Sequence, residues 1–286
     1  MSKVLVTGAT GNVGPHVVDA LRARGASVRA FVRDADTAKE TLGADIDLAI
    51  GDFDDHRSLR RALHGVDHVF LTSADGPRKV DHETAVIDAA AAAWVRIVKL
   101  SSPTVEIGSD LEFWDWHGRI ERHLAASGVP AVFLRANFFM SGLLASADAV
   151  RHTGQLFAPA DDAKIAMIDP RDIGAAAAVL LTEDGHDGGT YTVTGPEAIT
   201  YRDVAGQLSA ATGREITFVD VPDDAARGAM LESGAPPWLA DNLVTLFGKL
   251  RDGACADVTD TVANLTGRPP HTFAEWARDH AALFRG

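Results

Sequence analysis

An apolar segment near the start of the chain runs straight into a glycine-rich turn, in the stretch Val4-Leu5-Val6-Thr7-Gly8-Ala9-Thr10-Gly11-Asn12-Val13-Gly14. A helical pattern follows it. In a strand-turn-helix unit of this kind, Gly8 permits the tight turn, Gly11 lets a pyrophosphate approach the backbone, and Gly14 allows close helix–strand packing. The helix N-terminus adds free N–H groups that attract phosphate. We therefore predict a nucleotide-binding turn, rather than a tight turn without a ligand, with contacts from Gly8, Thr10, Gly11, Asn12, Val13 and Gly14.

The first half of the chain continues this alternation of short apolar segments and helical patterns. Strands are predicted at residues 4–7, 27–32, 46–50, 66–71, 95–100 and 131–134, and helices at 13–24, 35–42, 57–63, 82–93 and 111–126. Strands separated by helices imply parallel βαβ units with right-handed crossovers. Their nearly continuous apolar character fits a sheet covered on both faces. The predicted fold is α/β, a doubly wound parallel Rossmann sheet.

After about residue 140 the alternation becomes less regular. Further strands are predicted at residues 154–158, 164–168, 190–193 and 216–219, and helices at 170–181 and 201–212. The rest is expected to be helical, with breaks at the two Pro-Pro pairs, 236–237 and 269–270. We predict a Rossmann domain over residues 1–150, to which later strands return, and a smaller, mostly helical C-terminal α/β substrate lobe over 151–286. No long polar linker divides them, so they are expected to pack as one unit.

Composition excludes several classes of protein. The net charge of −13 comes without a block of Lys or Arg, so no nucleic-acid partner is expected. No apolar stretch is long enough to cross a membrane, and the N-terminus lacks a secretory signal pattern. Cys255 is the one cysteine and cannot form an intramolecular disulfide, which favours a cytoplasmic location.

Histidines show no spacing typical of a metal site, and no metal is predicted. The scattered His64, His68, His123 and His152 are interpreted as surface residues.

The end of the second predicted strand distinguishes between cofactors. NAD-binding proteins place an acidic residue there to bond the ribose 2′-hydroxyl. Here Arg33 occupies that place, and a guanidinium can bind a 2′-phosphate through two hydrogen bonds. NADP(H) is therefore preferred over NAD(H). A shift of one residue would put Asp34 there instead, and Arg33 would then be an ordinary surface residue.

Two further strand ends are expected near the nucleotide. Asp52 and Phe53 follow the third strand, where they would bond and pack against adenine or would form only a turn. Leu71 and Thr72 end the fourth strand, where the backbone passes close to the cofactor.

Several motifs, in order along nearly the whole chain, resemble the NmrA-like family of atypical short-chain dehydrogenases. Besides the glycine turn, they are Phe31-Val32-Arg33, Gly51-Asp52, Leu100-Ser101-Ser102, the His117…Glu121…Ser127-Gly128 segment, Leu134 to Met140, Asp169-Pro170-Arg171-Asp172-Ile173 and Tyr191 to Pro196. Ala136 departs from the proline usual in the family. The resemblance implies an NADP-binding Rossmann domain with a small substrate lobe. The family is similar to quinone, triphenylmethane-dye and isoflavone-type reductases, and it also includes redox-sensing regulators.

Ordinary short-chain dehydrogenases use a serine and a Tyr-x-x-x-Lys pair, and this chain lacks that pair. The equivalent helix carries Phe113 and His117 at the two positions. Phe113, His117, Ile120 and Leu124 share one apolar stripe, which places His117 inward. We predict that His117 bonds the ribose or donates a proton, unless it is a satisfied core histidine. Ser101 and Ser102 end the fifth strand, either as catalytic hydrogen-bonding groups or as a loop cap.

Aromatic and apolar residues are expected to form a substrate pocket at the carboxyl edge of the sheet. The predicted members are Phe113, Trp114, Trp116, Asn137, Phe138, Phe139, Met140 and Trp238, some of which would instead be ordinary core. Such a pocket suits a flat hydrophobic molecule.

The expected function is an NADPH-dependent reduction of a hydrophobic aromatic or conjugated carbonyl or quinone-type small molecule. The alternatives are an NADP(H)-sensing regulator without turnover and a non-redox enzyme on a Rossmann scaffold. A monomer and a homodimer both remain open.

Overall fold

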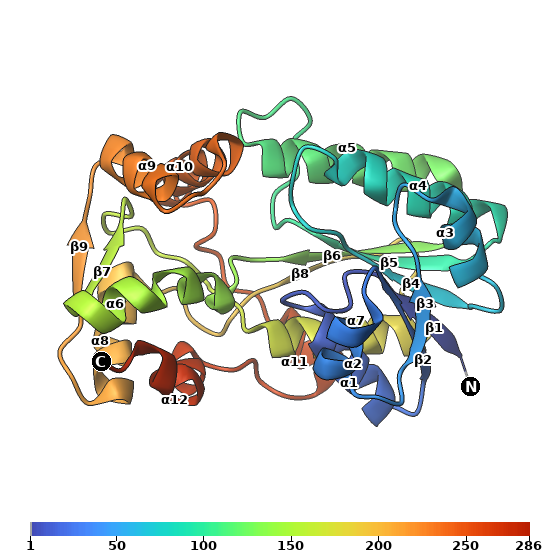
Figure 1. Ribbon diagram of the computed structural model, residues 1–286, viewed down its shortest axis with the longest axis horizontal. Helices are drawn as coiled ribbons and strands as arrows, with labels where there is room; N and C mark the ends of the chain where they lie inside the picture. Colours follow the sequence, from blue (N-terminus) through green and yellow to red (C-terminus); the bar gives the residue numbers. More distant parts are fainter. Residues whose placement is uncertain (1) are drawn as a thin grey trace.

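The computed structural model describes residues 2–286 and contains one large parallel sheet (Figure 1). Its strand order is β3-β2-β1-β4-β5-β6-β8, and every paired neighbour runs parallel. The strands are β1 (Lys3–Val6), β2 (Ser27–Val32), β3 (Asp47–Ile50), β4 (His68–Leu71), β5 (Arg96–Ser101), β6 (Ala131–Ala136) and β8 (Thr190–Val193). The order reverses direction between β1 and β4, which places a ligand crevice beyond their carboxyl ends.

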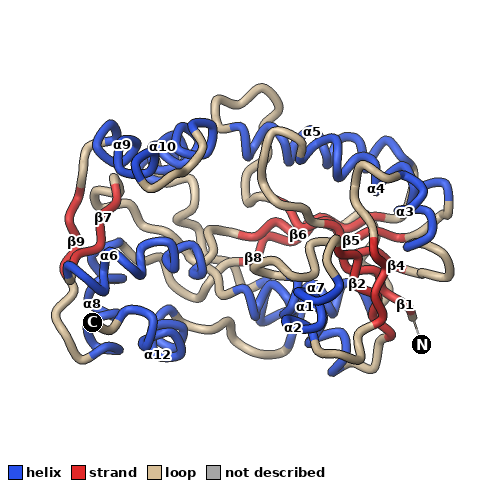
Figure 2. The backbone as a smooth tube through the Cα atoms, in the orientation of Figure 1, coloured by secondary structure: helices blue, strands red, loops and turns tan. Residues whose placement is uncertain are grey.

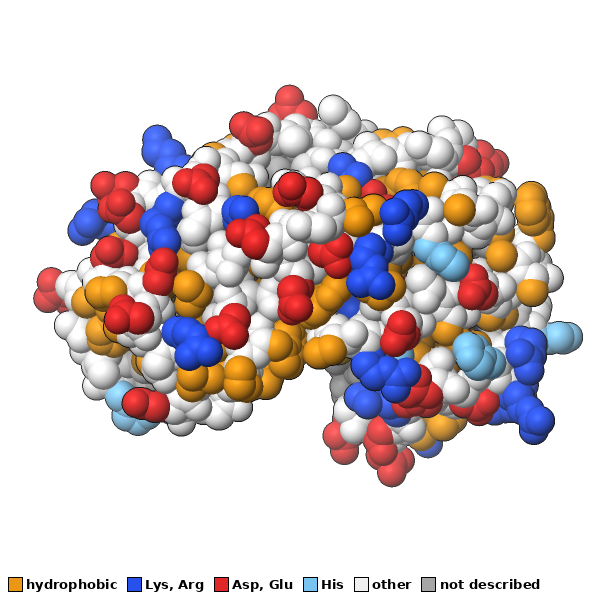
Figure 3. All heavy atoms as spheres, turned by 90° about the horizontal axis from the view of Figure 1, so that it is seen from above, with side chains coloured by type: hydrophobic (Ala, Val, Ile, Leu, Met, Phe, Trp, Pro, Cys, Tyr) orange, Lys and Arg blue, Asp and Glu red, His pale blue; other side chains and the backbone are white. Residues whose placement is uncertain are grey.

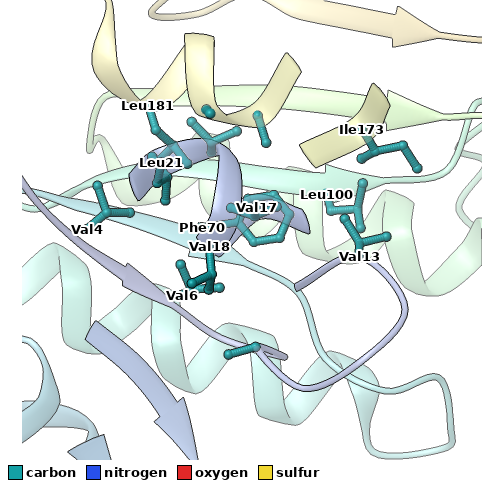
Figure 4. Close-up of a cluster of buried hydrophobic side chains, with 14 of the residues drawn as sticks. Val4, Val6, Val13, Val17, Val18, Leu21, Phe70, Leu100, Ile173 and Leu181 are labelled. Atoms are coloured by element: carbon teal, nitrogen blue, oxygen red, sulfur yellow. The ribbon is translucent and has the colours of Figure 1, made fainter. Parts of the chain in front are cut away.

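Helices cover both faces of this sheet (Figure 2). One face carries α1 (Gly14–Ala23), α2 (Ala35–Leu42), α7 (Pro170–Thr182) and α11 (Thr261–Thr266), and the other carries α3 (His56–Ala62), α4 (Lys79–Ala92) and α5 (Glu112–Ser127). Figure 4 shows Val17 of α1 against Phe70 of β4, and Leu21 of α1 beside Leu181 of α7. Burial of such side chains is the main stabilising contribution to this layer.

The second lobe has its own apolar core, with Trp276, Phe273 and Phe284 fully buried in it. Its elements are a 3-10 helix (Met140–Ser146), α6 (Ala147–Thr153), β7 (Gln155–Ala158), α8 (Tyr201–Thr212), β9 (Thr217–Asp220), α9 (Asp223–Glu232), α10 (Pro237–Arg251) and α12 (Phe273–Phe284). Strands β7 and β9 form a separate parallel pair. Capping boxes at Thr200–Asp203 and Thr272–Glu275 begin α8 and α12.

The doubly wound fold predicted from the sequence is confirmed. The two lobes are not successive stretches of chain, because α7, β8 and α11 return to the first lobe from beyond residue 150. Among residues 2–286, no helix is long and apolar enough to span a membrane.

Three local predictions were wrong. Residues 164–168 form no strand and make only isolated bridges, from Ile165 to Ile199 and from Ile168 to Phe139. Helix α4 begins at Lys79, three residues before the predicted start, and no side chain caps it. His68 is half-buried within β4 instead of lying on the surface, and burial lowers the pKa of its imidazole.

Candidate active site

A cleft of about 810 Å³ opens at the carboxyl edge of the large sheet. Residues from both lobes line it, from the glycine turn after β1 to Leu239, Leu243 and Leu246 of α10. The surface seen in Figure 3 is indented between the lobes, with apolar side chains gathered at its inner edge. The cleft therefore combines a nucleotide-type turn with an apolar wall.

The glycine turn is held in shape by backbone contacts. Gly8 has a φ of +58°, and a Cβ there would lie 2.7 Å from the Thr72 methyl group. A Cβ on Gly14 would lie 2.3 Å from the Gly8 carbonyl oxygen. At Gly11 a Cβ would meet only that same oxygen, at 3.3 Å, so its other side faces open space. This open side fits the close approach of a phosphate to the backbone.

The turn is fastened to the next strand by Thr7. Its Oγ1 donates to the Thr72 carbonyl oxygen at 2.7 Å and accepts from the Thr72 N–H at 2.9 Å. The turn and the end of β4 therefore form one rigid side of the cleft.

Arg33 and Asp34, at the end of β2, have different roles. Asp34 accepts a hydrogen bond from the Thr37 N–H at 2.7 Å and so caps α2, a bond that also lowers the pKa of its carboxyl group. Arg33 is exposed and lines the cleft. The carboxylate is thus engaged with its own helix, and the guanidinium is the group that faces the cleft.

Asp52 and Phe53 also line the cleft. The Phe53 ring stacks on the His82 imidazole, with 5.3 Å between ring centroids. Asp52 Oδ1 accepts from the Asp54 N–H at 3.0 Å, which is a local turn contact. Gly51 has a packing role, because a Cβ there would lie 2.4 Å from Ser58 Oγ.

The floor of the cleft holds a buried cluster of charged side chains next to His117. Lys99 Nζ, on β5, lies 3.2 Å from His117 Nδ1 and 2.9 Å from Glu83 Oε2. Glu83 Oε1 lies 2.9 Å from Lys79 Nζ, one helical turn earlier on α4. Burial, together with the charges of Lys99 and Lys79, holds the pKa of His117 well below its usual value. His117 is therefore neutral at physiological pH.

Two serines lie beside this floor. Ser101 is buried at the end of β5, and its Oγ has no hydrogen-bond partner among the described residues. A buried hydroxyl without a partner is costly, and a bound molecule would relieve that cost. Ser102 also lines the cleft and is half-buried.

The wall opposite the glycine turn is apolar. Three segments build this wall: α5 contributes Trp114, the loop after β6 contributes Phe138, and α10 contributes Leu243. Asn242 fastens α10 to the start of α5, because its Oδ1 accepts from the Glu112 N–H at 2.9 Å and its Nδ2 donates to Glu112 Oε2 at 2.7 Å. The apolar wall therefore depends on a contact between elements 130 residues apart.

Most of the predicted site residues line this cleft. They are Gly8, Thr10, Gly11, Asn12, Val13, Gly14, Arg33, Asp52, Phe53, Thr72, Ser101, Ser102, Phe113, His117, Asn137, Phe138 and Phe139. Asn137 also has a structural role, because its Nδ2 donates to the Cys255 carbonyl oxygen at 3.1 Å and its Oδ1 accepts from the Phe138 N–H.

Four predicted residues lie outside the cleft lining. Leu71 is fully buried in the core between the sheet and helices α3, α4 and α5, and Met140 is buried in the core of the second lobe. Trp116 is buried behind the wall, where its ring packs 5.9 Å from that of Trp238. The other expected tryptophan of α5, Trp114, does line the cleft, and on α10 Leu239 lines it in place of Trp238.

Neither of the two tyrosines of the chain lines the cleft. Tyr191 contacts His186 Nδ1 through its hydroxyl at 2.8 Å. Tyr201 is buried in the second core, and burial raises the pKa of its phenol. No phenol is placed to act in the cleft.

Sequence reasoning missed the charged cluster beside His117. One signal was present: Lys99 interrupts an otherwise apolar strand that is covered on both faces, where an isolated charge is costly. Lys79 was hidden because the start of α4 was placed after it, so its position one helical turn before Glu83 was not recognised.

Residues 1–248 match the model of the NmrA-like family, and the chain belongs to that family.

Similar proteins are known in bacteria. The chain is 38% identical to the NAD(P)H azoreductase of Xenophilus azovorans, over 98% of this chain and 99% of that protein. It is 40% identical to the (4-alkanoyl-5-oxo-2,5-dihydrofuran-3-yl)methyl phosphate reductase of Streptomyces griseus subsp. griseus, with the same coverage. The NADPH complex of the quinone oxidoreductase QOR2 from Escherichia coli superimposes with a TM-score of 0.87 at 31% identity, covering 96% of this chain and 99% of that one.

Proposed function

We propose that this NAD(P)H-dependent oxidoreductase reduces flat, conjugated aromatic molecules of the quinone or azo type. The observation that carries the proposal is the cleft itself, in which a nucleotide-type turn and an apolar aromatic wall meet over a neutral histidine. The relatives named above include an azoreductase and a quinone oxidoreductase, which supports the same substrate class.

The cofactor is NADP(H), and the residues that line one side of the cleft fit it. The N–H groups of the turn and of the α1 N-terminus would hold the pyrophosphate at the open side of Gly11. Arg33 would bind the 2′-phosphate, since Asp34 is occupied as a helix cap. When bound, NADPH supplies a hydride, and with it two electrons.

The protein would then hold the substrate and supply a proton. Trp114, Phe138 and Leu243 would enclose the aromatic rings. Ser101 Oγ, which has no partner in the described chain, would donate to a substrate oxygen or nitrogen. His117 would donate the proton to the substrate oxygen or nitrogen as negative charge develops on that atom. Quinone and azo reductions place that charge on a delocalised group, so they do not require a tyrosine acid.

The test is the rate of NADPH oxidation with a panel of quinones, azo dyes and aromatic ketones, with NADH as the control nucleotide. Turnover that prefers NADPH and planar acceptors is expected. Fluorescence titration of NADPH runs in parallel. Tight NADPH binding without turnover of any acceptor would contradict the proposed reaction and favour a nucleotide sensor.

His117 is tested separately with His117→Ala. We expect kcat to fall by roughly 10²-fold, the lower range for general acid catalysis. Unchanged turnover together with unchanged NADPH affinity would exclude His117 from both roles.

A further inference from the structure

Lys99 is an unusual residue for the middle of a parallel sheet. Its side chain is fully buried on β5, under the cleft floor. Its Nζ forms an ion pair with Glu83 Oε2 at 2.9 Å and lies within hydrogen-bond distance of His117 Nδ1, at 3.2 Å, and of the carbonyl oxygen of Leu100. An ammonium group has three N–H donors and no acceptor, so this environment accommodates the charged form of lysine.

This environment determines which nitrogen of His117 carries the proton. The ammonium of Lys99 can only donate, so Nδ1 of His117 must accept and must itself carry no hydrogen. In the neutral ring the hydrogen is then on Nε2. His117 lines the cleft, and its Nε2 makes no hydrogen bond to any described residue. The N–H of His117 is therefore available to a molecule bound in the cleft.

We propose that Lys99 is the positioning residue of His117: it fixes the Nε2–H form of the ring and replaces the proton that the ring gives to the substrate. This inference rests on the proposed reductase function, which it deepens by naming the proton source.

The proposed step consists of two coupled proton transfers, one from His117 to the substrate and one from Lys99 to His117. The His117 Nε2–H bond breaks as an O–H or N–H bond forms on the reduced substrate. One Lys99 Nζ–H bond breaks as an Nδ1–H bond forms, so the imidazole stays neutral throughout. The two electrons arrive with the hydride from the cofactor. The cycle then closes by the reverse path: solvent in the cleft gives a proton to His117 Nε2 as Nδ1 returns its proton to Lys99 Nζ, which restores the Nε2–H ring and the charged lysine before the next turnover.

The charges around the pair favour this arrangement over a charged histidine. Lys99 faces Glu83 and Lys79 on α4 and His117 and Glu121 on α5. Burial lowers the pKa of Lys99, which makes its proton easier to release. Burial alone would also lower the pKa of Lys79, but Glu83 and Asp75 raise it on balance. Lys79 therefore keeps its proton, and Glu83 stays ionised between the two lysines.

The first test measures the tautomer directly, by nitrogen NMR of histidine-labelled protein, with His117→Ala to assign the signal. We expect an unprotonated Nδ1 and a protonated Nε2 in the wild type between pH 6 and 8, a range set around the ordinary histidine pKa. In Lys99→Met, the ring is expected to lose this preference and to titrate closer to the ordinary range. A wild-type ring protonated at Nδ1 would overturn the proposal.

Lys79→Met is the matched control for that measurement. Lys79 contacts the same carboxylate and the Ser73 carbonyl oxygen but makes no hydrogen bond to the His117 ring, so the tautomer should be kept. Lys99→Met leaves Glu83 paired with Lys79 and should fold, which circular dichroism and NADPH titration would check. If Lys99→Met does not fold, Lys99→Gln keeps a neutral donor and is measured in its place.

The second test concerns turnover. We expect kcat of Lys99→Met to fall by about 10²-fold, with the NADPH Kd changed by less than about 2-fold. Because the lysine must be protonated, wild-type kcat should decline as pH rises through the pKa of Lys99, and the variant should lack that decline. An unchanged kcat and pH profile would overturn the proton-resupply role. If no acceptor is reduced, the reductase proposal fails while the tautomer measurement still decides whether Lys99 positions His117.

Discussion

The two sides of the cleft are built in different ways. We call residues 8–14 with Arg33, Asp52 and Thr72 the turn wall, and Trp114, Phe138, Leu239, Leu243 and Leu246 the lobe wall. The turn wall is made largely of backbone, in a shape that glycines permit. The lobe wall is made of side chains from three distant segments. A backbone-built wall tolerates almost no added atom, whereas a side-chain wall changes gradually with each substitution.

Gly14→Ala should cause the largest change. The new Cβ would lie 2.3 Å from the Gly8 carbonyl oxygen and 2.6 Å from two backbone atoms of Ala9, so the turn must move. We expect a loss of about 3 kcal/mol in the free energy of unfolding, the upper range for overpacking. NADPH affinity should fall by roughly 10²-fold, since a displacement of about 1 Å has effects of that order. Urea unfolding and fluorescence titration measure the two.

Gly206→Ala is the control for that variant. Gly206 is a helical glycine of α8 with open space where a Cβ would stand. The Gly206→Ala substitution should stabilise the protein by about 0.5–1 kcal/mol and leave the NADPH Kd unchanged. Equal behaviour of the two variants would contradict the view that the turn wall is sterically closed.

Arg33→Ser tests the polar end of the turn wall. The variant loses a charge-assisted contact of about 1.5–3 kcal/mol, so the NADPH Kd should rise by roughly 10- to 100-fold. The NADH Kd should stay nearly unchanged, because NADH has no 2′-phosphate. Arg60→Ser, another exposed arginine but on α3 and outside this cleft, should alter neither Kd. A parallel loss of NADH affinity would show that Arg33 acts on the fold instead of the phosphate.

Leu243→Ala tests the lobe wall, and a smaller effect is expected. A half-buried leucine loses part of its apolar contact, about 1–2 kcal/mol, so the KM for a planar acceptor should rise by roughly 10-fold. The NADPH Kd should not change. Leu283→Ala, on an exposed leucine of α12, is the control and should change neither value. A change confined to the NADPH Kd would reverse the assignment of the two walls.

Asn242→Ala should have the smallest effect on substrate. It removes the contacts that fasten α10 to Glu112, while the apolar residues themselves remain. We expect KM to rise by about 3-fold and the free energy of unfolding to fall by about 1 kcal/mol, as for a typical hydrogen bond. Asn264→Ala, on an exposed position of α11, should be neutral in both steady-state kinetics and urea unfolding. A KM unchanged by Asn242→Ala would mean that the lobe wall holds its position without this contact.

The two walls also differ in how much of each could be predicted from the sequence. The loop from Gly8 to Gly14 is one contiguous stretch, and all of its predicted members line the cleft. For the lobe wall, the right elements were named but not every residue. Of the two tryptophans expected from α5, Trp114 lines the cleft and Trp116 does not, and on α10 Leu239 lines it where Trp238 was expected. A helical pattern of apolar residues on both faces does not reveal which face meets the cleft.

The sequence by itself determined the parallel Rossmann sheet, the glycine turn and the absence of a Tyr-x-x-x-Lys pair. These depend on local periodicity, on backbone sterics and on residue identity, all of which are encoded over short stretches. Only the tertiary structure decided that Lys79, Glu83, Lys99 and His117 meet at the cleft floor. Their meeting requires the start of α4, the register of β5 and the rotation of α5 to be fixed together. Only long-range packing fixes those three quantities.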